Sequence, residues 1–401
     1  MKVKVLIADK FPDKHIQQLK DLNLDVEYSP KLGENDLPQA AKDANILVVR
    51  STIVNAETIN SAEKLSLIIR AGAGVNNIDI QTANKKGVYV ANCPGMNSVA
   101  VAELAIGLMI AIDRKIPDNV VDFRNGKWNK AEYSKADGLL GKTLGVVGTG
   151  KIGLEVIKRA KSFGLDIIAW SRSLTDEKAE ELEIERCKTL DELFTNADII
   201  SVHLAQTADT KKLINKDLIS KMKNGAYFIN TARAGVVDED ALIEAAKEGK
   251  IFLGLDVFNN EPEGKSGDFT TPLKELKNVY LTHHIGASTE QAQNAVADET
   301  IRIIDDFVNA GKIKNWVNRI KQSPAKYQLV VRHYDKPGVL ARVLRLLSEE
   351  KINAQEMENV IFDGAETACC TIKLDSKPSD KLLEEIPSAK DEVIHLSLIE
   401  L

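Results

Sequence analysis

The stretch from Thr143 to Arg172 constrains the fold most strongly, because it has the pattern of a strand, a glycine turn, a helix and a second strand. After the apolar run Leu144 to Val147 come Gly148-Thr149-Gly150-Lys151-Ile152-Gly153, and apolar residues then recur at helical spacing. In such a turn the first glycine permits a tight bend, the second lets a pyrophosphate approach the backbone, and the third allows close packing of helix on strand. The N–H groups at the helix start favour an anion. The pattern predicts a dinucleotide site at these six residues, with a plain strand–helix turn as the structural alternative.

The acidic residue that normally ends such a unit is missing. A carboxylate about 20 residues past the glycines usually accepts hydrogen bonds from the adenosine ribose, but here the second strand ends at Trp170 and continues as Ser171-Arg172-Ser173. A neutral Ser171 leaves space for a 2′-phosphate, and Arg172 is able to bind one with two hydrogen bonds. NAD and NADP therefore both remain candidate cofactors on this pattern, and an arginine that faces only solvent is the structural alternative.

Length and composition describe a chain of several domains. At 401 residues the chain is too long for one core and predicts two or three domains. The net charge of −6 and the isoelectric point near 5.7 give no basic surface for nucleic acid. No apolar run approaches the roughly 20 residues that span a bilayer, and the N-terminus opens directly into a strand without a signal peptide. We therefore expect no nucleic-acid or membrane partner and a cytoplasmic location.

The four cysteines indicate neither a metal site nor a disulfide framework. Cys93, Cys187, Cys369 and Cys370 show no CxxC spacing. Adjacent cysteines are also poorly placed to share a metal or to form an ordinary disulfide. We predict that all four are reduced packing residues.

Alternating strands and helices precede the glycine unit. Apolar strands at Val3 to Ala8, Ile46 to Val49 and Leu67 to Arg70 are typical of a parallel sheet covered on both faces. Ligands of such sheets bind beyond the carboxyl ends of the strands. Arg50-Ser51 is therefore placed to hold a phosphate or a carboxylate, or to form an ordinary salt bridge. The glycine-containing turn from Ala71 to Asp79 is either a carboxylate site or a plain turn into the next helix.

Later strands end in polar residues that are expected at the cleft edge of the glycine turn. These residues are His203, Thr231 and Asp256, and the last strand runs into His283-His284. The carboxyl ends of parallel strands meet at one edge of their sheet. The sequence therefore predicts a polar cleft there.

Arg233, Glu261 and His284 have the residue types that fit a reaction in this cleft. Oxidation of a secondary alcohol by a nicotinamide needs a base for the hydroxyl proton, and histidine is suited to that task. A neighbouring carboxylate favours the charged imidazole and orients it. Arginine grips a substrate carboxylate with two parallel hydrogen bonds. On residue types alone, His203 and His283 compete for the role of the base, and Arg233 has a structural alternative.

The tail from Tyr327 onward is predicted to be a separate small domain. After a polar connector it has the order strand, helix, strand, strand, helix, strand, with a short strand at Val360 to Phe362 and a closing strand at Val393 to Leu398. This order is the ferredoxin-like split arrangement.

Five motifs together resemble one enzyme family, the D-isomer-specific 2-hydroxyacid dehydrogenases. Within it the chain is most similar to the members that oxidise 3-phospho-D-glycerate and carry a C-terminal ACT domain. The resemblance covers nearly the whole chain. Its motifs are Asn97 to Glu103, Gly148 to Gly153, Asn230 to Gly235 before Val237-Asp238, Asp256 to Pro262, and His284 to Thr289.

The resemblance implies roles for individual residues. Arg233, Glu261 and His284 would be catalytic, as the motif positions that they occupy are in the family. Substrate contacts would come from Arg50, Ser51, Ala73, Gly74, Asn97 and Arg233, and cofactor contacts from Gly148, Thr149, Gly150, Lys151, Ile152, Gly153, Ser171, Arg172, His203, Thr210, Thr231 and Asp256. The sequence departs from the family at His283, Ala234 and Ser171, where proline, glycine and aspartate are usual.

The resemblance also implies an architecture and a function. The fold would be α/β, with two Rossmann-like doubly wound parallel-sheet domains, one of them discontinuous, and a C-terminal ferredoxin-like ACT domain. The expected boundaries are 1–96 and 286–317 for the substrate domain, 97–285 for the NAD-binding domain, 318–326 for a linker and 327–401 for the ACT domain. The implied reaction is oxidation of 3-phospho-D-glycerate with NAD in the first step of serine biosynthesis.

Partners and alternative functions follow from the same resemblance. A homodimer or homotetramer is expected, and L-serine is a candidate ligand of the ACT domain, where His333 and Asn353 match ligand-contacting positions. A pure assembly module is the alternative for this domain, because Asp335 stands where asparagine is usual. For the whole chain the alternatives are an NADPH-dependent glyoxylate or hydroxypyruvate reductase and a non-catalytic nucleotide-sensing corepressor on the same fold.

Overall fold

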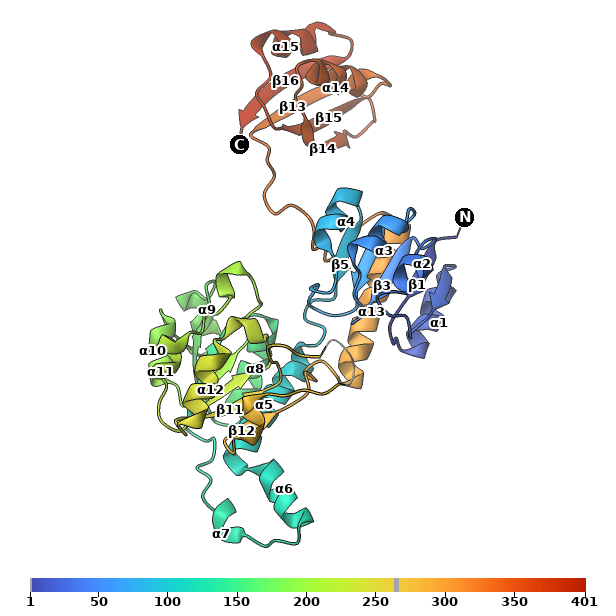
Figure 1. Cartoon of the computed structure of the whole chain (residues 1–401). Helices are drawn as coiled ribbons and strands as arrows, with labels where there is room; N and C mark the ends of the chain where they lie inside the picture. Colours follow the sequence, from blue (N-terminus) through green and yellow to red (C-terminus); the bar gives the residue numbers. More distant parts are fainter. Residues whose placement is uncertain (1, 263–266) are drawn as a thin grey trace. The chain divides into compact units, whose positions relative to one another are not determined.

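A computed structural model describes residues 2–262 and 267–401, in two compact units (Figure 1). The first unit runs to Asn318 and the second begins at Arg319, where the sequence predicts a linker over 318–326. Over the described ranges, no helix combines the length and the apolar character needed to cross a membrane.

The first sheet of the N-terminal unit consists of five parallel strands in the order β2-β1-β3-β4-β5. The central strand β3 is apolar throughout and buried at every position, as expected for a parallel strand covered on both faces. The strands are β1 (Lys4–Ile7), β2 (Asp25–Tyr28), β3 (Ile46–Val49), β4 (Leu67–Arg70) and β5 (Tyr89–Asn92). The helices that follow them are α1 (Asp13–Asp21), α2 (Leu37–Ala40), α3 (Ala56–Ser61) and α4 (Ile80–Lys86).

A long helix from far along the chain completes this core. Ala297 and Ile303 of α13 (Glu290–Ala310) are buried in one cluster with Ile7 of β1. Thr289 begins the helix, because its side chain accepts a hydrogen bond from the Ala292 amide at 3.1 Å. The segment after the helix also returns to the first sheet, because the Val90 amide donates to Asn318 at 2.9 Å.

The second sheet has seven parallel strands in the order β12-β11-β10-β9-β6-β7-β8. It starts with β6, the strand of the glycine unit, and β7 and β9 lie on either side of β6. The chain order therefore reverses at β6, which is where ligands bind in open α/β sheets. The strands are β6 (Thr143–Val147), β7 (Asp166–Trp170), β8 (Glu185–Arg186), β9 (Ile199–Val202), β10 (Ala226–Asn230), β11 (Ile251–Leu255) and β12 (Val279–Leu281).

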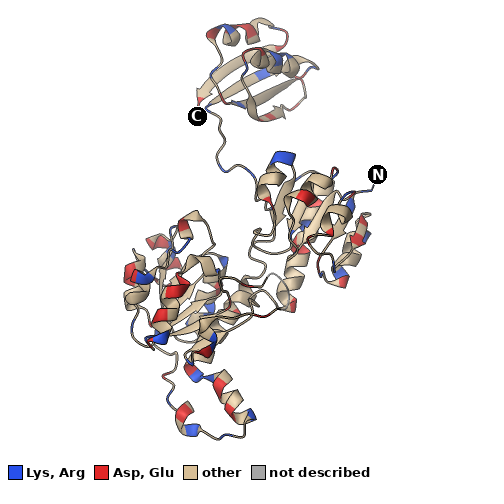
Figure 2. Cartoon of the chain, viewed as in Figure 1, with Lys and Arg blue, Asp and Glu red and all other residues tan. Residues whose placement is uncertain are grey.

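Helices cover both faces of this sheet. The apolar helix α5 (Ser98–Arg114) and α8 (Lys151–Ser162) share one buried cluster, and α10 (Leu190–Asn196) and α12 (Glu239–Lys247) share the other. Lysine, arginine and acidic residues alternate on the outer helices rather than gathering by sign (Figure 2). The remaining helical segments are α6 (Ile116–Arg124), α7 (Lys130–Tyr133), α9 (Asp176–Glu181), α11 (Lys216–Ser220), and the 3-10 turns η1 (Ala208–Thr210), η2 (Ala234–Val236) and η3 (Pro272–Glu275).

The C-terminal unit is a four-stranded antiparallel sheet with helices, in the strand order β14-β15-β13-β16. Its elements are β13 (Tyr327–Tyr334), α14 (Val339–Glu349), β14 (Ala354–Ile361), β15 (Thr367–Leu374), α15 (Asp380–Glu385), η4 (Ile386–Ser388) and β16 (Val393–Glu400). Leu329, Val343 and Ile372 belong to its own buried core.

The predicted fold class is confirmed, but one strand is longer than the sequence predicts. Two parallel sheets are followed by a smaller antiparallel unit, as the sequence predicts. The expected strand Val360 to Phe362 is in fact the end of β14, which begins at Ala354. This strand lies at an edge of the sheet and is exposed over most of its length, so its polar residues carry no burial pattern.

Candidate active site

Three neighbouring strands bring together the predicted catalytic residues. Arg233 follows β10, Glu261 follows β11 and His284 follows β12. Because β10, β11 and β12 are adjacent and parallel, their carboxyl ends meet at one edge of the second sheet. Residues separated by about 50 positions thus line one cavity of about 590 Å³, together with Arg70 at the end of β4 and with Ser51 and Gly74 from loops of the first sheet.

His284 and Glu261 form a hydrogen-bonded pair in this cavity. Nδ1 of His284 lies 2.7 Å from Oε2 of Glu261, while Oε1 of Glu261 accepts the Phe258 amide at 2.9 Å. Burial raises the pKa of Glu261, but the hydrogen bonds from His284 and from the Phe258 amide outweigh it and leave the pKa below its ordinary value. The carboxylate is therefore ionised near neutral pH and fixes the proton of the imidazole on Nδ1. Nε2 is left as the nitrogen that can accept a proton.

Asp256 fixes the turn that carries His284. His284 has a φ of 50°, which is unusual for a residue with a side chain. The buried Asp256 carboxylate accepts the amides of Ile285 and Gly286, both at 2.8 Å, and the Thr282 hydroxyl at 2.6 Å. These bonds hold the backbone on both sides of His284, which offsets a strain of order 1 kcal/mol or more. The structure thus gives Asp256 a positioning contact in addition to its predicted cofactor contact.

Arg233 reaches the cavity because a glycine faces it. Its Nη1 donates to the Ala232 carbonyl at 2.6 Å. A side-chain carbon at Gly74 would lie 2.9 Å from Nη2 of Arg233, so the loop after β4 can approach the guanidinium only without one. The neighbouring Ala73 carbonyl instead accepts the Asn92 side chain at 2.5 Å. Of the predicted backbone pair, Gly74 therefore lines the cavity, while the Ala73 carbonyl holds the loop to β5.

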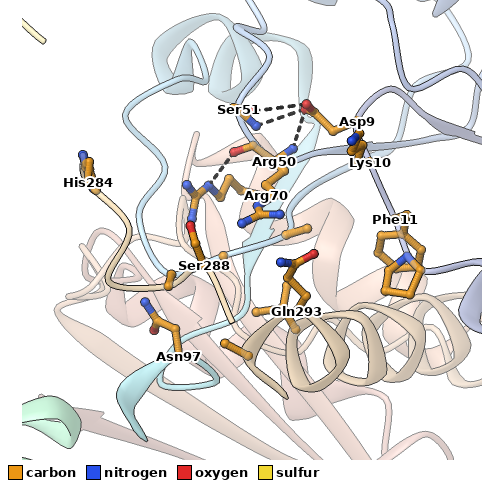
Figure 3. Close-up of a pocket in the computed structure, with 16 residues that line it drawn as sticks. Asp9, Lys10, Phe11, Arg50, Ser51, Arg70, Asn97, His284, Ser288 and Gln293 are labelled. Atoms are coloured by element: carbon orange, nitrogen blue, oxygen red, sulfur yellow. Dashed lines mark hydrogen bonds between the residues drawn. The ribbon is translucent and has the colours of Figure 1, made fainter. Parts of the chain in front are cut away.

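A second cavity of about 370 Å³ adjoins the first and is rich in cationic groups (Figure 3). The two cavities share Ser51, Arg70 and His284. Arg50, Lys10 and Asn97 also line the second cavity. Burial, and then the neighbouring Arg233 and Arg50, lower the pKa of Arg70 to about 10, which still leaves it charged near neutral pH.

Asp9, which sequence reasoning missed, shapes this cavity. The Arg50 and Ser51 amides donate to its carboxylate at 2.8 and 3.0 Å, and the Ser51 hydroxyl donates at 3.1 Å (Figure 3). The Thr52 amide donates to the same carboxylate at 3.0 Å. Burial raises the pKa of Asp9, but the backbone hydrogen bonds prevail and leave it below its ordinary value. Asp9 and Arg70 both stand at the carboxyl ends of predicted strands, so the rule that selected Arg50 and Ser51 would have found them.

A third cavity of about 490 Å³ surrounds the glycine turn. It brings together seven of the predicted cofactor residues, which are Gly148, Thr149, Gly150, Ser171, Arg172, His203 and Thr210. Lys151, Ile152 and Gly153 begin α8 instead, and the Lys151 ammonium donates to the Pro94 carbonyl at 3.0 Å. Gly153 serves packing, because a side-chain carbon there would lie 2.0 Å from the Gly148 carbonyl oxygen.

The site fits a dinucleotide with a polar nicotinamide end. An added side-chain carbon at Gly150 would meet open space, so the turn is accessible from the cavity. Seven buried side-chain polar atoms of the described residues have no hydrogen-bond partner, and three of them belong to predicted ligand residues: Oδ1 of Asn97, Nδ1 of His203 and Oγ1 of Thr231. Unpaired buried groups of this kind are costly unless a ligand or water satisfies them.

The competing histidines differ from His284. His203 is buried against Ser201, at 2.8 Å between Nε2 and Oγ, and burial lowers its pKa to about 3. It is thus neutral near pH 7 and lines the cavity of the glycine turn. His283 is exposed and does not belong to the described lining of the first or second cavity, whereas its neighbour His284 lines both.

The chain belongs to the D-isomer specific 2-hydroxyacid dehydrogenase family. A model of this family's NAD binding domain matches residues 106–286. A hydroxypyruvate reductase of Thermotoga maritima is 43% identical over 297 residues, which are 73% of this chain and 94% of that protein. The predicted family is confirmed.

Other relatives are longer than this chain. A D-3-phosphoglycerate dehydrogenase of Methanocaldococcus jannaschii is 42% identical over 318 residues, and one of Archaeoglobus fulgidus is 38% identical over 349 residues. The matches cover 79% and 85% of this chain but only 59% and 64% of those proteins. The NAD+-bound 3-phosphoglycerate dehydrogenase of Entamoeba histolytica superposes with a TM-score of 0.66 at 31% identity, over 80% of this chain and all of that chain.

Proposed function

We propose that the protein is an NAD-dependent dehydrogenase that oxidises 3-phospho-D-glycerate to 3-phosphohydroxypyruvate in serine biosynthesis. One observation carries the proposal: the His284–Glu261 pair and Arg233 line a cavity that adjoins a second, cationic cavity. A base, a carboxylate grip and a distal anion site are the parts that this reaction needs. Similarity to D-3-phosphoglycerate dehydrogenases supports the substrate.

The three residues divide the chemistry among them. Arg233 holds the substrate carboxylate through two parallel hydrogen bonds, which fixes the hydroxyl-bearing carbon. His284 takes the hydroxyl proton on Nε2, and the ionised Glu261 stabilises the resulting imidazolium. A nicotinamide cofactor bound beside the substrate would supply the acceptor for the hydride that leaves the same carbon. Proton and hydride together account for the two hydrogens that the alcohol loses.

Residues of the third cavity would hold the cofactor. The amides of Gly148, Thr149 and Gly150 at the start of α8 suit a pyrophosphate. Thr231 and His203 each offer a buried polar atom without a protein partner. NAD is supported by the family's NAD binding domain and by the NAD+ in the Entamoeba structure.

The second cavity suits the phosphate end of the substrate. Arg50 and Arg70 line it, and the Arg70 Nε donates to the Arg50 backbone carbonyl at 3.0 Å, which fixes the Arg70 side chain beside the Arg50 backbone. Lys10 adds a third cation. Guanidinium groups bind phosphate with paired hydrogen bonds, which favours a phosphorylated hydroxy acid over an unphosphorylated one.

Reduction of hydroxypyruvate is the second candidate function. The match to the Thermotoga hydroxypyruvate reductase, at 43% identity over 94% of that protein, favours it. A non-catalytic sensor is the third reading from the sequence, and the ordered His284–Glu261 pair argues against it, because a sensor has no use for a positioned base.

A comparison of two keto acids tests the substrate. Purified protein is assayed with NADH and either 3-phosphohydroxypyruvate or hydroxypyruvate, in wild type and in Arg50→Ala. We expect kcat/KM to be higher for the phosphorylated acid, and Arg50→Ala to lower that value by about 100-fold, since a charge-assisted contact contributes about 3 kcal/mol at most. Hydroxypyruvate is the internal control and should change less than about threefold. Equal losses for both acids would favour the reductase.

We also propose a cytoplasmic location for the protein and a regulatory role for its C-terminal unit. The described cysteines are free thiols, which suits a reducing cytoplasm. We propose that the C-terminal unit is an ACT domain that binds L-serine and takes part in a homodimer or homotetramer. His333, a predicted ligand position, is buried and lies 3.1 Å from Asn359, whereas Asn353 is exposed.

A further inference from the structure

The cavity around the glycine turn has balanced charge. Among the described residues that line it, only Arg172 and Asp209 carry a full charge at neutral pH. Nη1 of Arg172 lies 3.2 Å from Oδ2 of Asp209. Arg172, which the sequence predicts as a candidate ligand of a 2′-phosphate, therefore already has a carboxylate partner.

Asp209 reaches this position from the strand on the other side of the glycine turn. β7, which precedes Arg172, and β9, which precedes Asp209, both pair with β6. Their carboxyl ends therefore flank the turn that follows β6. The adenosine ribose of a bound dinucleotide is read in this region, normally by a carboxylate at the end of β7, where this chain has Ser171.

The backbone under Asp209 is held firmly. Asp209 lies in η1, where the Thr207 amide donates to the Thr210 hydroxyl at 2.8 Å and that hydroxyl donates to the Ala205 carbonyl at 2.6 Å. The turn is thus fixed at both ends, and Asp209 presents its side chain to the cavity from a defined place.

We propose that Asp209 replaces the missing ribose carboxylate and sets the preference of this chain for NAD over NADP. The inference rests on the proposed function, since it concerns the cofactor of the same site. A 2′-phosphate would have to separate Arg172 from Asp209 and then lie beside an ionised carboxylate. The ribose hydroxyls of NAD carry no such charge and can donate hydrogen bonds to Asp209. The Asp209 carboxylate therefore disfavours NADP in two ways: it repels the 2′-phosphate, and it neutralises the charge of Arg172 that would otherwise attract this phosphate.

Direct binding of reduced cofactors tests the proposal without any substrate. The dissociation constants of NADH and NADPH are measured by fluorescence titration for wild type, Asp209→Asn, Arg172→Ser and the double variant. Asp176→Asn is the matched control, because Asp176 is also exposed and paired with an arginine, Arg186 at 3.0 Å, but is absent from the described lining of the cavity.

We expect Asp209→Asn to tighten NADPH binding by about tenfold, the effect of removing a carboxylate beside a phosphate dianion in a solvated site, and to change NADH binding less than about threefold. When Arg172 is already replaced by serine, Asp209→Asn should tighten NADPH binding by only about threefold or less, because no arginine is then freed from its pairing with Asp209. Asp176→Asn should leave both constants unchanged.

An Asp209→Asn ratio of NADH to NADPH affinity that stays within about twofold of wild type would overturn the inference, provided that wild type binds NADH. If Asp209→Asn tightened NADPH binding equally with and without Arg172, the proposed role of the Arg172–Asp209 pair would also be wrong. Failure of wild type to bind either nucleotide would instead overturn the proposed function, and this inference with it.

Discussion

Replacing Glu261 with glutamine should impair turnover without disturbing cofactor binding. The glutamine keeps an oxygen for the Phe258 amide, which donates to Glu261 at 2.9 Å, but loses the charge that faces His284 at 2.7 Å. The imidazolium that forms when His284 takes a proton then has only a neutral partner. The loss should therefore fall on the chemical step.

The size of the effect follows from the exposure of the pair. A hydrogen bond to a charged group contributes about 1.5 to 3 kcal/mol. The side chains of His284 and Glu261 are 48% and 31% exposed, so solvent screening places this pair at the lower end. A loss of about 1.5 kcal/mol corresponds to a roughly tenfold lower kcat.

Steady-state kinetics and NADH titration separate the two effects, with Glu239→Gln as a matched control. Glu239 also accepts an amide of this loop, that of Asn259 at 2.8 Å, so it shares the positioning contact of Glu261. Of the two carboxylates, Glu261 is the one that forms the hydrogen bond with His284. We expect kcat to fall about tenfold in Glu261→Gln and less than about twofold in Glu239→Gln. Equal losses in both variants, or a Glu261→Gln enzyme above half of wild-type kcat, would refute the role of the charge.

Three further predictions concern other parts of the chain. Arg233→Lys should lower kcat/KM for the hydroxy acid by about 100-fold, because an ammonium cannot make two parallel hydrogen bonds; unchanged kinetics would make Arg233 structural. Burial lowers the pKa of His203 to about 3 against about 6.5 in the unfolded state, so the unfolded state binds more protons between these values and stability decreases as the pH falls. Between pH 7 and pH 5 the wild-type free energy of unfolding should therefore drop by roughly 2 kcal/mol, measured by urea unfolding with tryptophan fluorescence, and His203→Gln should not show this drop. A chain ending at Asn318 should stay folded and active, because Arg319 begins a separate compact unit; insoluble or inactive protein would contradict this.

The sequence was sufficient for the fold class and for bringing the three candidate catalytic residues together. Apolar strands in alternation with helices gave the two parallel sheets, because burial on both faces leaves a strong local pattern. The same strand-end rule brought Arg233, Glu261 and His284 to one cavity. For the edge strand β14 the sequence predicts only the last residues, because exposed residues leave no such pattern.

What the sequence could not provide is contacts between distant side chains. Arg172 was interpreted by itself as a candidate phosphate ligand, while its partner Asp209 stands 37 residues later in a turn without a motif. Asp256 was assigned to the cofactor, although its carboxylate also holds the turn of His284. Such pairings depend on the sheet order, which places β7 and β9 on either side of β6.

The most direct test of the central claim is NADH formation from 3-phospho-D-glycerate and NAD, followed at 340 nm for wild type and His284→Asn. Wild type should turn over, and His284→Asn should lose at least about 100-fold in kcat, the usual contribution of a general base, while it binds NADH as wild type does. A His284→Asn enzyme with more than a tenth of wild-type kcat, or wild type that binds NADH but oxidises no D-2-hydroxy acid, would contradict the account.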